Sequence, residues 1–289
     1  MSRPAPSAST TVGVVGAGTM GNGIAEVSAR AGCRAVVVET QSEALERARH
    51  SLAASLGRGE AKGALTEPAD AVLARVSYTS DLADLRECSI VIEAIRESLT
   101  DKVALIVELD GLLAPDAVIA SNTSSIPIAK LAAASVNPER VIGMHFFNPV
   151  PVMPLVEIIP SLLTASATDS WAHAFARTVL QKTTVSAQDR AGFLVNTIFV
   201  PYALSAIRML DSGLATAEDI DAGLVGGCGM PMGPIRLADM IGLDTMLLVA
   251  ESLYEEYLDP AFAPPVLLRR HVDAGRLGRK SGRGFYAYP

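Results

Sequence analysis

The chain has 289 residues, of which 49% are hydrophobic and 19% are charged, and its formal net charge is −7. This length suits two domains better than one core, and the acidic balance excludes a nucleic-acid-binding protein that works through general basic character. The three cysteines, Cys33, Cys88 and Cys228, are far apart and lack CxxC spacing. We therefore expect no disulfide framework and no metal, and a reducing compartment such as the cytoplasm.

The first ten residues are small, polar and proline-bearing, and they lack the apolar segment of a signal peptide. We expect residues 1–10 to form a disordered lead. The longest nearly apolar stretch, residues 193–207, is interrupted by Asn196, Thr197, Pro201 and Ser205. That is too broken for a membrane span, so we expect a helix buried in protein and no membrane partner.

A glycine-rich motif follows the first predicted strand, residues 11–16. Residues 16–21 spell G-A-G-T-M-G, with Thr19 and Met20 before the last glycine. A helical pattern and a second strand come next, and that strand ends at Glu39. Strand, G-x-G-x-x-G, helix, strand and acid in this register predict a dinucleotide site. Gly16 permits the tight turn, Gly18 lets the backbone approach the pyrophosphate, and Gly21 lets the helix pack closely.

The acid of this motif, Glu39, would accept hydrogen bonds from the adenosine ribose. A carboxylate there repels a 2′-phosphate, so NAD is favoured over NADP. Residues 43–56 then predict an amphipathic helix. The glycine-rich stretch 55–63 that ends it is most simply a solvated loop.

Further strands alternate with helices through residue 189, which indicates a mostly parallel sheet. Residues 89–95 and 118–120 are expected to be buried strands, and residues 101–113 a helix. The second of these strands opens into residues 121–125, S-N-T-S-S. Such a cluster is normally an N-cap and turn, but the carboxyl end of a strand is also where this kind of sheet binds ligands.

Residues 141–157 form the stretch around which the function is organised. An apolar strand leads into His145, three prolines force the backbone to turn, and Glu157 follows in a second apolar run. The carboxylate could hold one nitrogen of the imidazole and leave the other as a base. The alternative is a hydrogen-bonded core histidine and a solvent-facing Glu.

The pattern becomes all-helical near residue 190, with helices expected at 193–212, 217–226, 234–257 and 265–274. This change marks a domain boundary. We therefore predict an α/β fold: a Rossmann-type doubly wound, mostly parallel sheet in residues 11–190, followed by an all-α C-terminal domain in residues 191–289.

These motifs together resemble the short 3-hydroxyacyl-CoA dehydrogenases, including the bacterial 3-hydroxybutyryl-CoA dehydrogenases. The resemblance covers residue 11 to the C-terminus. It rests on GAGTMGNGIA at Gly16, SNTSS at Ser121, HFFNPVPVMPLVE at His145, GFLVN at Gly192, PMGPIRLADMIGLDT at Pro231 and GRKSGRGFYAY at Gly278. One departure is Glu39, where these enzymes usually have the shorter Asp.

The resemblance implies a role for particular residues. His145 would be the catalytic histidine and Glu157 its partner acid, with Ser124 and Asn196 binding the substrate. The implied cofactor contacts are Glu39, Ala94, Glu97, Lys102, Ser124 and Asn148. The implied contacts to coenzyme A are Ser55 and Lys62, which would overturn the solvated-loop interpretation for this pair, and Arg58 is a candidate for the 3′-phosphate.

The expected reaction is the NAD-dependent interconversion of (S)-3-hydroxyacyl-CoA and 3-ketoacyl-CoA, with short acyl chains. The resemblance also implies a homodimer formed through the helical domain, and Asn196 predicts a site in the cleft between the domains. One alternative is a related dehydrogenase acting on a carrier-protein-bound acyl group or a free hydroxy acid. The other is a nucleotide-binding structural or sensor protein that has lost the chemistry.

Overall fold

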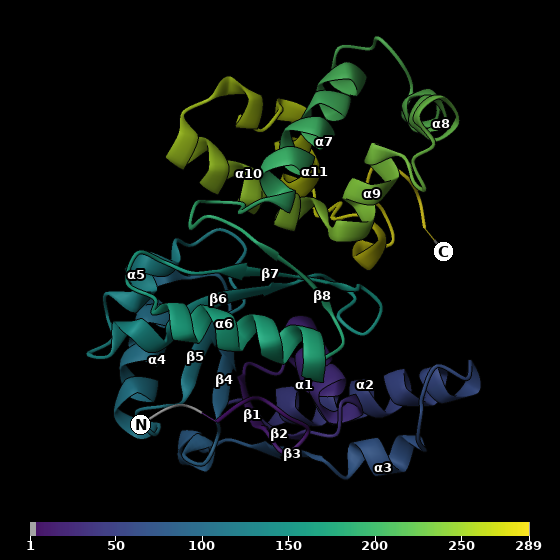
Figure 1. Ribbon diagram of the computed structural model, residues 1–289. Helices are drawn as coiled ribbons and strands as arrows, with labels where there is room; N and C mark the ends of the chain where they lie inside the picture. Colours follow the sequence, from purple (N-terminus) through teal and green to yellow (C-terminus); the bar gives the residue numbers. More distant parts are fainter. Residues whose placement is uncertain (1–3, 289) are drawn as a thin grey trace. The chain divides into compact units, whose positions relative to one another are not determined.

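The computed structural model describes residues 4–288 (Figure 1). The chain divides into two compact units, Met1–Asp189 and Arg190–Pro289. The first carries the sheet and the second is helical, as the sequence predicted for the fold class. The first three residues of the expected disordered lead lie outside the described residues. Residues 4–10 are placed on the sheet unit, where Trp171 Nε1 donates a hydrogen bond to the Pro4 carbonyl at 2.8 Å.

The sheet unit is built on eight strands in the order β3-β2-β1-β4-β5-β6-β7-β8. All neighbouring pairs are parallel except β6 and β7, which are antiparallel. The order reverses direction between β1 and β4, which is where doubly wound sheets bind ligands. The strands are β1 (Thr11–Val15), β2 (Arg34–Val38), β3 (Val76–Thr79), β4 (Ile90–Glu93), β5 (Val118–Ser121), β6 (Val141–Phe146), β7 (Leu155–Ile159) and β8 (Thr183–Ser186).

Helices cover both faces of this sheet (Figure 1). They are α1 (Thr19–Arg30), α2 (Ser42–Ala61), α3 (Ala69–Leu73), α4 (Leu99–Leu112), α5 (Ile128–Ala132) and α6 (Ser166–Ala174), which continues into a π-helical turn at Phe175–Val179. Helices α1 and α6 contribute to one hydrophobic cluster with the strands. Helix α5 packs on the opposite face, where Ile128 lies against Gly143 of β6.

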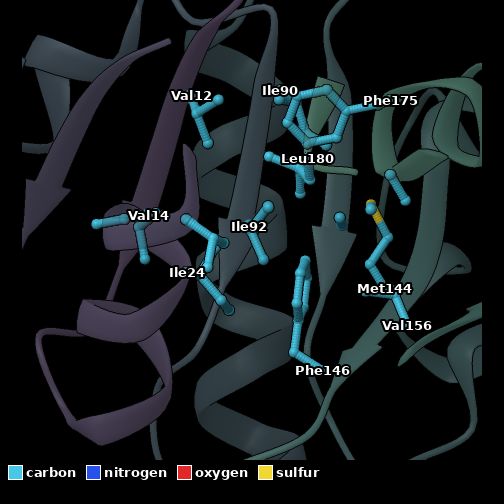
Figure 2. Close-up of a cluster of buried hydrophobic side chains, with 14 of the residues drawn as sticks. Val12, Val14, Ile24, Ile90, Ile92, Met144, Phe146, Val156, Phe175 and Leu180 are labelled. Atoms are coloured by element: carbon cyan, nitrogen blue, oxygen red, sulfur yellow. The ribbon is translucent and has the colours of Figure 1, made fainter. Parts of the chain in front are cut away.

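One face of the sheet packs into a large hydrophobic cluster. Alternate residues of each strand point to the same face, and one set points into the cluster. Figure 2 shows the labelled members Val12, Val14, Ile24, Ile90, Ile92, Met144, Phe146, Val156, Phe175 and Leu180. The strand residues between them, including Glu93, His145 and Glu157, therefore belong to the opposite face.

Two expectations about helices were wrong in detail. The glycine-rich stretch expected to be a loop is helical through Ala61, and its first glycine with a positive φ is Gly63, which follows the helix. The single helix expected at 234–257 is broken at Gly242, whose φ of 105° is incompatible with a right-handed helix.

The second unit has its own hydrophobic core. Its helices are α7 (Val195–Asp211), α8 (Ala217–Cys228), α9 (Pro234–Ile241), α10 (Leu243–Tyr257) and α11 (Val266–Asp273). The last residues are held by the buried carboxylate of Asp239, which accepts hydrogen bonds from the backbone N–H of Phe285 at 3.0 Å and of Tyr286 at 2.9 Å. This tail therefore closes the core of the helical unit.

Ile90→Ala tests the role of the cluster in stability. Ile90 is fully buried in the middle of the sheet, and its truncation should lower the free energy of unfolding by about 2–5 kcal/mol. Chemical denaturation followed by fluorescence of Trp171, the single tryptophan, measures this in the sheet unit. Val152→Ala, at a side chain that is 73% exposed, is the control and should change the unfolding midpoint little. Equal midpoints for the two variants would contradict the assignment of Ile90 to the core.

Candidate active site

The glycine-rich turn lies between β1 and α1 at the carboxyl edge of the sheet. Gly16 has a φ of 104°, and a Cβ there would lie 2.5 Å from the Ala94 carbonyl oxygen. A Cβ on Gly21 would lie 1.9 Å from the Gly16 carbonyl oxygen, whereas a Cβ on Gly18 would meet no atom within 4 Å. The first and third glycines thus permit close packing, and the second leaves room for a ligand above the turn.

The start of α1 is suited to a phosphate. No side chain of the described residues caps it, and its first turn, which carries Thr19 and Met20, contains no acidic residue. Unpaired backbone N–H groups and the positive end of the helix dipole therefore remain for an anion. The exposed Gly18 lets that anion approach the backbone.

Glu39 follows β2 directly and reaches the same turn. Val15 of β1 and Val38 of β2 are in register, so the next residue of each strand lies side by side. The Glu39 carboxylate accepts hydrogen bonds from the backbone N–H of Ala17 at 3.3 Å and of Gln41 at 3.2 Å. The open turn, the uncapped helix and this half-buried carboxylate together fit a dinucleotide.

His145 and Glu157 contact each other, as the sequence predicted. They are directly opposite in the antiparallel β6–β7 pair, and His145 Nδ1 lies 2.6 Å from Glu157 Oε2. The histidine side chain is 8% exposed and the glutamate side chain 0%. A carboxylate only accepts hydrogen bonds, so Nδ1 of His145 donates the proton in this contact. Glu157 does not face solvent, because its side chain is fully buried.

Neighbouring groups hold the end of β6 in place. The Asn122 side-chain oxygen accepts a hydrogen bond from the backbone N–H of Phe146 at 2.8 Å. The ring of Phe147 packs on the imidazole of His145, with 4.6 Å between the ring centres. Asn122, which the sequence marked only as part of a turn, thus links β5 to the residue after the histidine.

Glu97 organises the turn that carries Ser124. Its Oε1 accepts hydrogen bonds from Thr123 Oγ1 at 2.5 Å and from the backbone N–H groups of Ser124 at 3.0 Å and Ser125 at 3.2 Å. Burial alone would raise the pKa of Glu97, but the Lys102 ammonium and these hydrogen bonds together lower it. The turn is therefore built around an ionised carboxylate.

Glu93 is a buried acid that the sequence analysis did not single out. It ends β4, is fully buried, and accepts hydrogen bonds from Lys102 Nζ and Ser121 Oγ, both at 2.5 Å. Burial raises its pKa, and Lys102 and Ser121 oppose that rise. A charged residue inside the apolar run of residues 89–95 was the signal that could have found it.

The remaining predicted site residues lie on several elements, and their roles stay predictions. Ala94 follows β4 next to the glycine turn, and Asn148 is exposed in the turn after β6. Ser55 is partly buried in α2, and Lys62 directly follows that helix and is exposed. Asn196 lies near the start of α7, in the helical unit.

Two family models match the chain over nearly its whole length. Residues 11–190 match the 3-hydroxyacyl-CoA dehydrogenase, NAD binding domain. Residues 192–288 match the 3-hydroxyacyl-CoA dehydrogenase, C-terminal domain. The boundary between the two matches falls at residue 191, one or two residues from the division between the two compact units.

Named relatives resemble the chain along its length. It is 52% identical to a 3-hydroxybutyryl-CoA dehydrogenase of Mycobacterium tuberculosis, across 96% of this chain and 98% of that protein. It is 43% identical to a probable 3-hydroxybutyryl-CoA dehydrogenase of Bacillus subtilis, across 95% and 96%.

Solved structures agree with this similarity. The crystal structure of FadB2 from M. tuberculosis has a TM-score of 0.95 and 51% identity, covering 97% of this chain and 99% of that one. That of the (S)-3-hydroxybutyryl-CoA dehydrogenase PaaH1 from Ralstonia eutropha has a TM-score of 0.90 and 47% identity, covering 96% and 99%.

Among residues 4–288, no helix combines the length and apolar character that crossing a membrane requires. The same residues contain no group of three or more His, Cys, Asp or Glu side chains placed to hold a metal ion.

Gly21→Ala tests the dinucleotide turn. The added methyl group would overlap the Gly16 carbonyl oxygen, so the turn must move, and affinity for NADH should fall at least about tenfold because the backbone no longer fits the pyrophosphate. Titration of NADH fluorescence measures this. Gly57→Ala, in helix α2 with nothing within 4 Å of the new Cβ, is the matched control and should bind NADH as the unaltered protein does. Unchanged affinity in the Gly21 variant would refute this placement of the cofactor.

Proposed function

This chain belongs to the 3-hydroxyacyl-CoA dehydrogenase family, since its two halves match that family's NAD-binding and C-terminal domains, and we propose that it acts as a 3-hydroxybutyryl-CoA dehydrogenase. In this function it interconverts (S)-3-hydroxybutyryl-CoA and acetoacetyl-CoA with NAD as cofactor. The short chain is supported by relatives of that name at 43–52% identity. The observation that carries the proposal is the buried hydrogen bond between His145 and Glu157.

The imidazole of His145 moves the proton. In oxidation, Nε2 accepts the proton of the substrate's C3 hydroxyl as that carbon gives up a hydride, which makes the group a ketone. In reduction, Nε2 returns the proton to the developing alkoxide. A neutral imidazole suits this exchange because it can accept a proton and return it.

Glu157 acts on the ring rather than on the substrate. Its Oε2 accepts the Nδ1 proton, which fixes the tautomer and the ring orientation. When Nε2 takes the substrate proton, the imidazolium gains a positive charge inside the protein. The adjacent carboxylate offsets the cost of burying that charge.

The glycine turn and Glu39 hold the dinucleotide. The turn with the start of α1 binds the pyrophosphate, and Glu39 binds the adenosine ribose. Bound NAD supplies the hydride acceptor, and NADH the donor. Ala94, Glu97, Lys102, Ser124 and Asn148 are proposed for the nicotinamide half of the cofactor.

Ser124 and Asn196 are proposed to hydrogen-bond the substrate oxygens and hold C3 in position. Ser55 and Lys62 are proposed to contact coenzyme A. Lys62 is exposed at the end of α2 and Arg58 lies one turn before it, which supports a place there for the negatively charged phosphates of coenzyme A. The acyl-CoA is therefore the proposed substrate in preference to a carrier-protein-bound acyl group or a free hydroxy acid.

The helical unit is proposed to form a homodimer. Large apolar side chains are exposed on it, including Ile198 on α7 and Leu214 after it. A mostly apolar hollow between α7 and α8, with Tyr202, Met209 and Leu224 among its lining residues, adds to this surface. Exposed apolar patches of this kind favour association. A cytoplasmic location is proposed as well, supported by free Cys33 and Cys88.

Oxidation of NADH, followed by absorbance with 3-ketoacyl-CoAs of four to sixteen carbons, tests the proposed function. We expect kcat/KM to be highest with acetoacetyl-CoA, and at least about tenfold lower with acetoacetyl-pantetheine because binding energy from the nucleotide is lost. NADPH should be a poorer donor, since Glu39 repels its 2′-phosphate. No turnover with any of these thioesters would refute the proposal, and equal rates with the pantetheine thioester would refute recognition of the nucleotide.

His145→Ala tests the general acid–base role. Loss of the imidazole should lower turnover with acetoacetyl-CoA by about 10²- to 10⁴-fold, while the affinity for NADH stays close to that of the unaltered protein because the glycine turn is untouched. Single-turnover kinetics and NADH titration separate the two effects. His50→Ala, at an exposed histidine of α2, is the control and should retain turnover. Unaltered turnover in the His145 variant would remove this residue from the chemistry.

A further inference from the structure

Two buried charged side chains, Glu93 and Lys102, and the partly buried Glu97 lie together where β4 and β5 end. Lys102 lies in the first turns of α4, and its side chain is 1% exposed. Its Nζ contacts Glu93 Oε1 at 2.5 Å, Glu97 Oε2 at 3.2 Å and the Ile95 carbonyl at 3.4 Å. Lys102 thus links the two carboxylates Glu93 and Glu97.

Glu93 reaches the turn that carries Ser124 by two routes. On the first, Ser121 Oγ donates to Glu93 Oε2 at 2.5 Å and accepts from the backbone N–H of Thr123 at 3.3 Å. On the second, Lys102 forms ion pairs with both Glu93 and Glu97. Glu97 in turn accepts hydrogen bonds from the backbone N–H groups of Ser124 and Ser125. Both routes start from one carboxylate with no exposed surface.

Burial of the Glu93 carboxylate is unfavourable unless its cation and its hydrogen-bond donors are all present. Burying a carboxylate without a cation and hydrogen bonds costs several kcal/mol. Glu93 therefore holds its three donors strongly, and these are Lys102 Nζ, Ser121 Oγ and the backbone N–H of Ile95. Two carboxylates share one ammonium, and removing the charge of Glu93 leaves Lys102 free to shift toward Glu97. That shift would change the position of the oxygen on which the turn is built.

We propose that Glu93 is a positioning residue that holds the Ser124 turn in its working conformation, acting through Ser121 and through Lys102 and Glu97. The role of Ser124 in the reaction rests on the proposed function, whereas the order of the turn does not. Glu93 itself touches neither substrate nor cofactor in this assignment.

Amide hydrogen exchange of the full-length protein tests the order of the turn. In Glu93→Gln, which keeps the shape and removes the charge, the backbone amides of Ser124 and Ser125 should exchange at least about tenfold faster than in the unaltered protein. Should Glu93→Gln fail to fold, Glu93→Asp keeps the charge and withdraws it by one methylene, and faster exchange at the same amides is expected. Unchanged protection in a folded variant of either kind would overturn the proposal.

Asp110→Asn is a matched control for loss of a buried ion pair. Asp110 also accepts from a cation, a serine and a backbone N–H, namely Arg140 at 3.0 Å, Ser135 Oγ at 2.5 Å and Val136 N at 2.9 Å. It lies eight residues along α4 from Lys102, which is about 12 Å of helix. The control should lose stability while leaving the exchange of the Ser124 turn unchanged. Equal acceleration of that exchange in both variants would mean general destabilisation and would overturn the proposal.

Kinetics gives a second readout that a purely structural role would not move. Glu93→Gln should lower kcat with acetoacetyl-CoA about ten- to a hundredfold, and the double variant with Ser124→Ala should be no more than about twofold slower than Ser124→Ala alone. If the losses of kcat caused by the two substitutions multiply in the double variant, Glu93 acts independently of Ser124, and the proposal is overturned. An unaltered protein without any NADH oxidation would refute the proposed function instead, and the exchange experiment would still decide the role of Glu93.

Discussion

The hydrogen bond between His145 and Glu157 depends on a single reversal of strand direction. In an otherwise largely parallel sheet, β7 runs antiparallel to β6, and this places the two residues directly opposite each other. A shift of one residue in that register would turn Glu157 into the hydrophobic cluster and Ile158 toward the histidine. Since a buried carboxylate without a partner is strongly unfavourable, the pairing and the register support each other.

The same alternation gathers the polar groups of the site on one face of the sheet. Ile92, Met144 and Val156 point into the hydrophobic cluster, so their neighbours Glu93, His145 and Glu157 point away from it. The strands therefore supply a rigid apolar layer on one face, and on the other face they fix the polar groups of the site. The close approach of Gly16 to the Ala94 carbonyl joins the cofactor turn to the end of β4, and Glu93 joins β4 to the turn after β5.

Much of this could be predicted from sequence because the responsible interactions are local. The glycine motif, the strand before it and the acid after β2 lie within thirty residues, and steric limits on glycine positions act over that range. Prediction from sequence failed where a glycine is compatible both with a continuing helix and with its end. Gly57 and Gly59 are tolerated inside α2, although glycines weaken helices, and the break at Gly242 shortens a pattern that looked continuous. Glu93 was passed over because its side-chain partners Lys102 and Ser121 lie nine and 28 residues away in the sequence.

The amino-acid sequence by itself indicated the two-domain organisation and the dinucleotide turn, because each follows from periodicity or from a motif of fixed spacing. The pair His145 and Glu157 was indicated only by the resemblance to a family. Only the tertiary structure decided which side chains share a proton or an ion. Glu93 meets Ser121 across 28 residues and Lys102 from the neighbouring helix, and Glu97 meets residues 123–125 of a different strand's turn. Such contacts depend on strand order and register, which arise from packing of the whole sheet and are absent from any short stretch of chain.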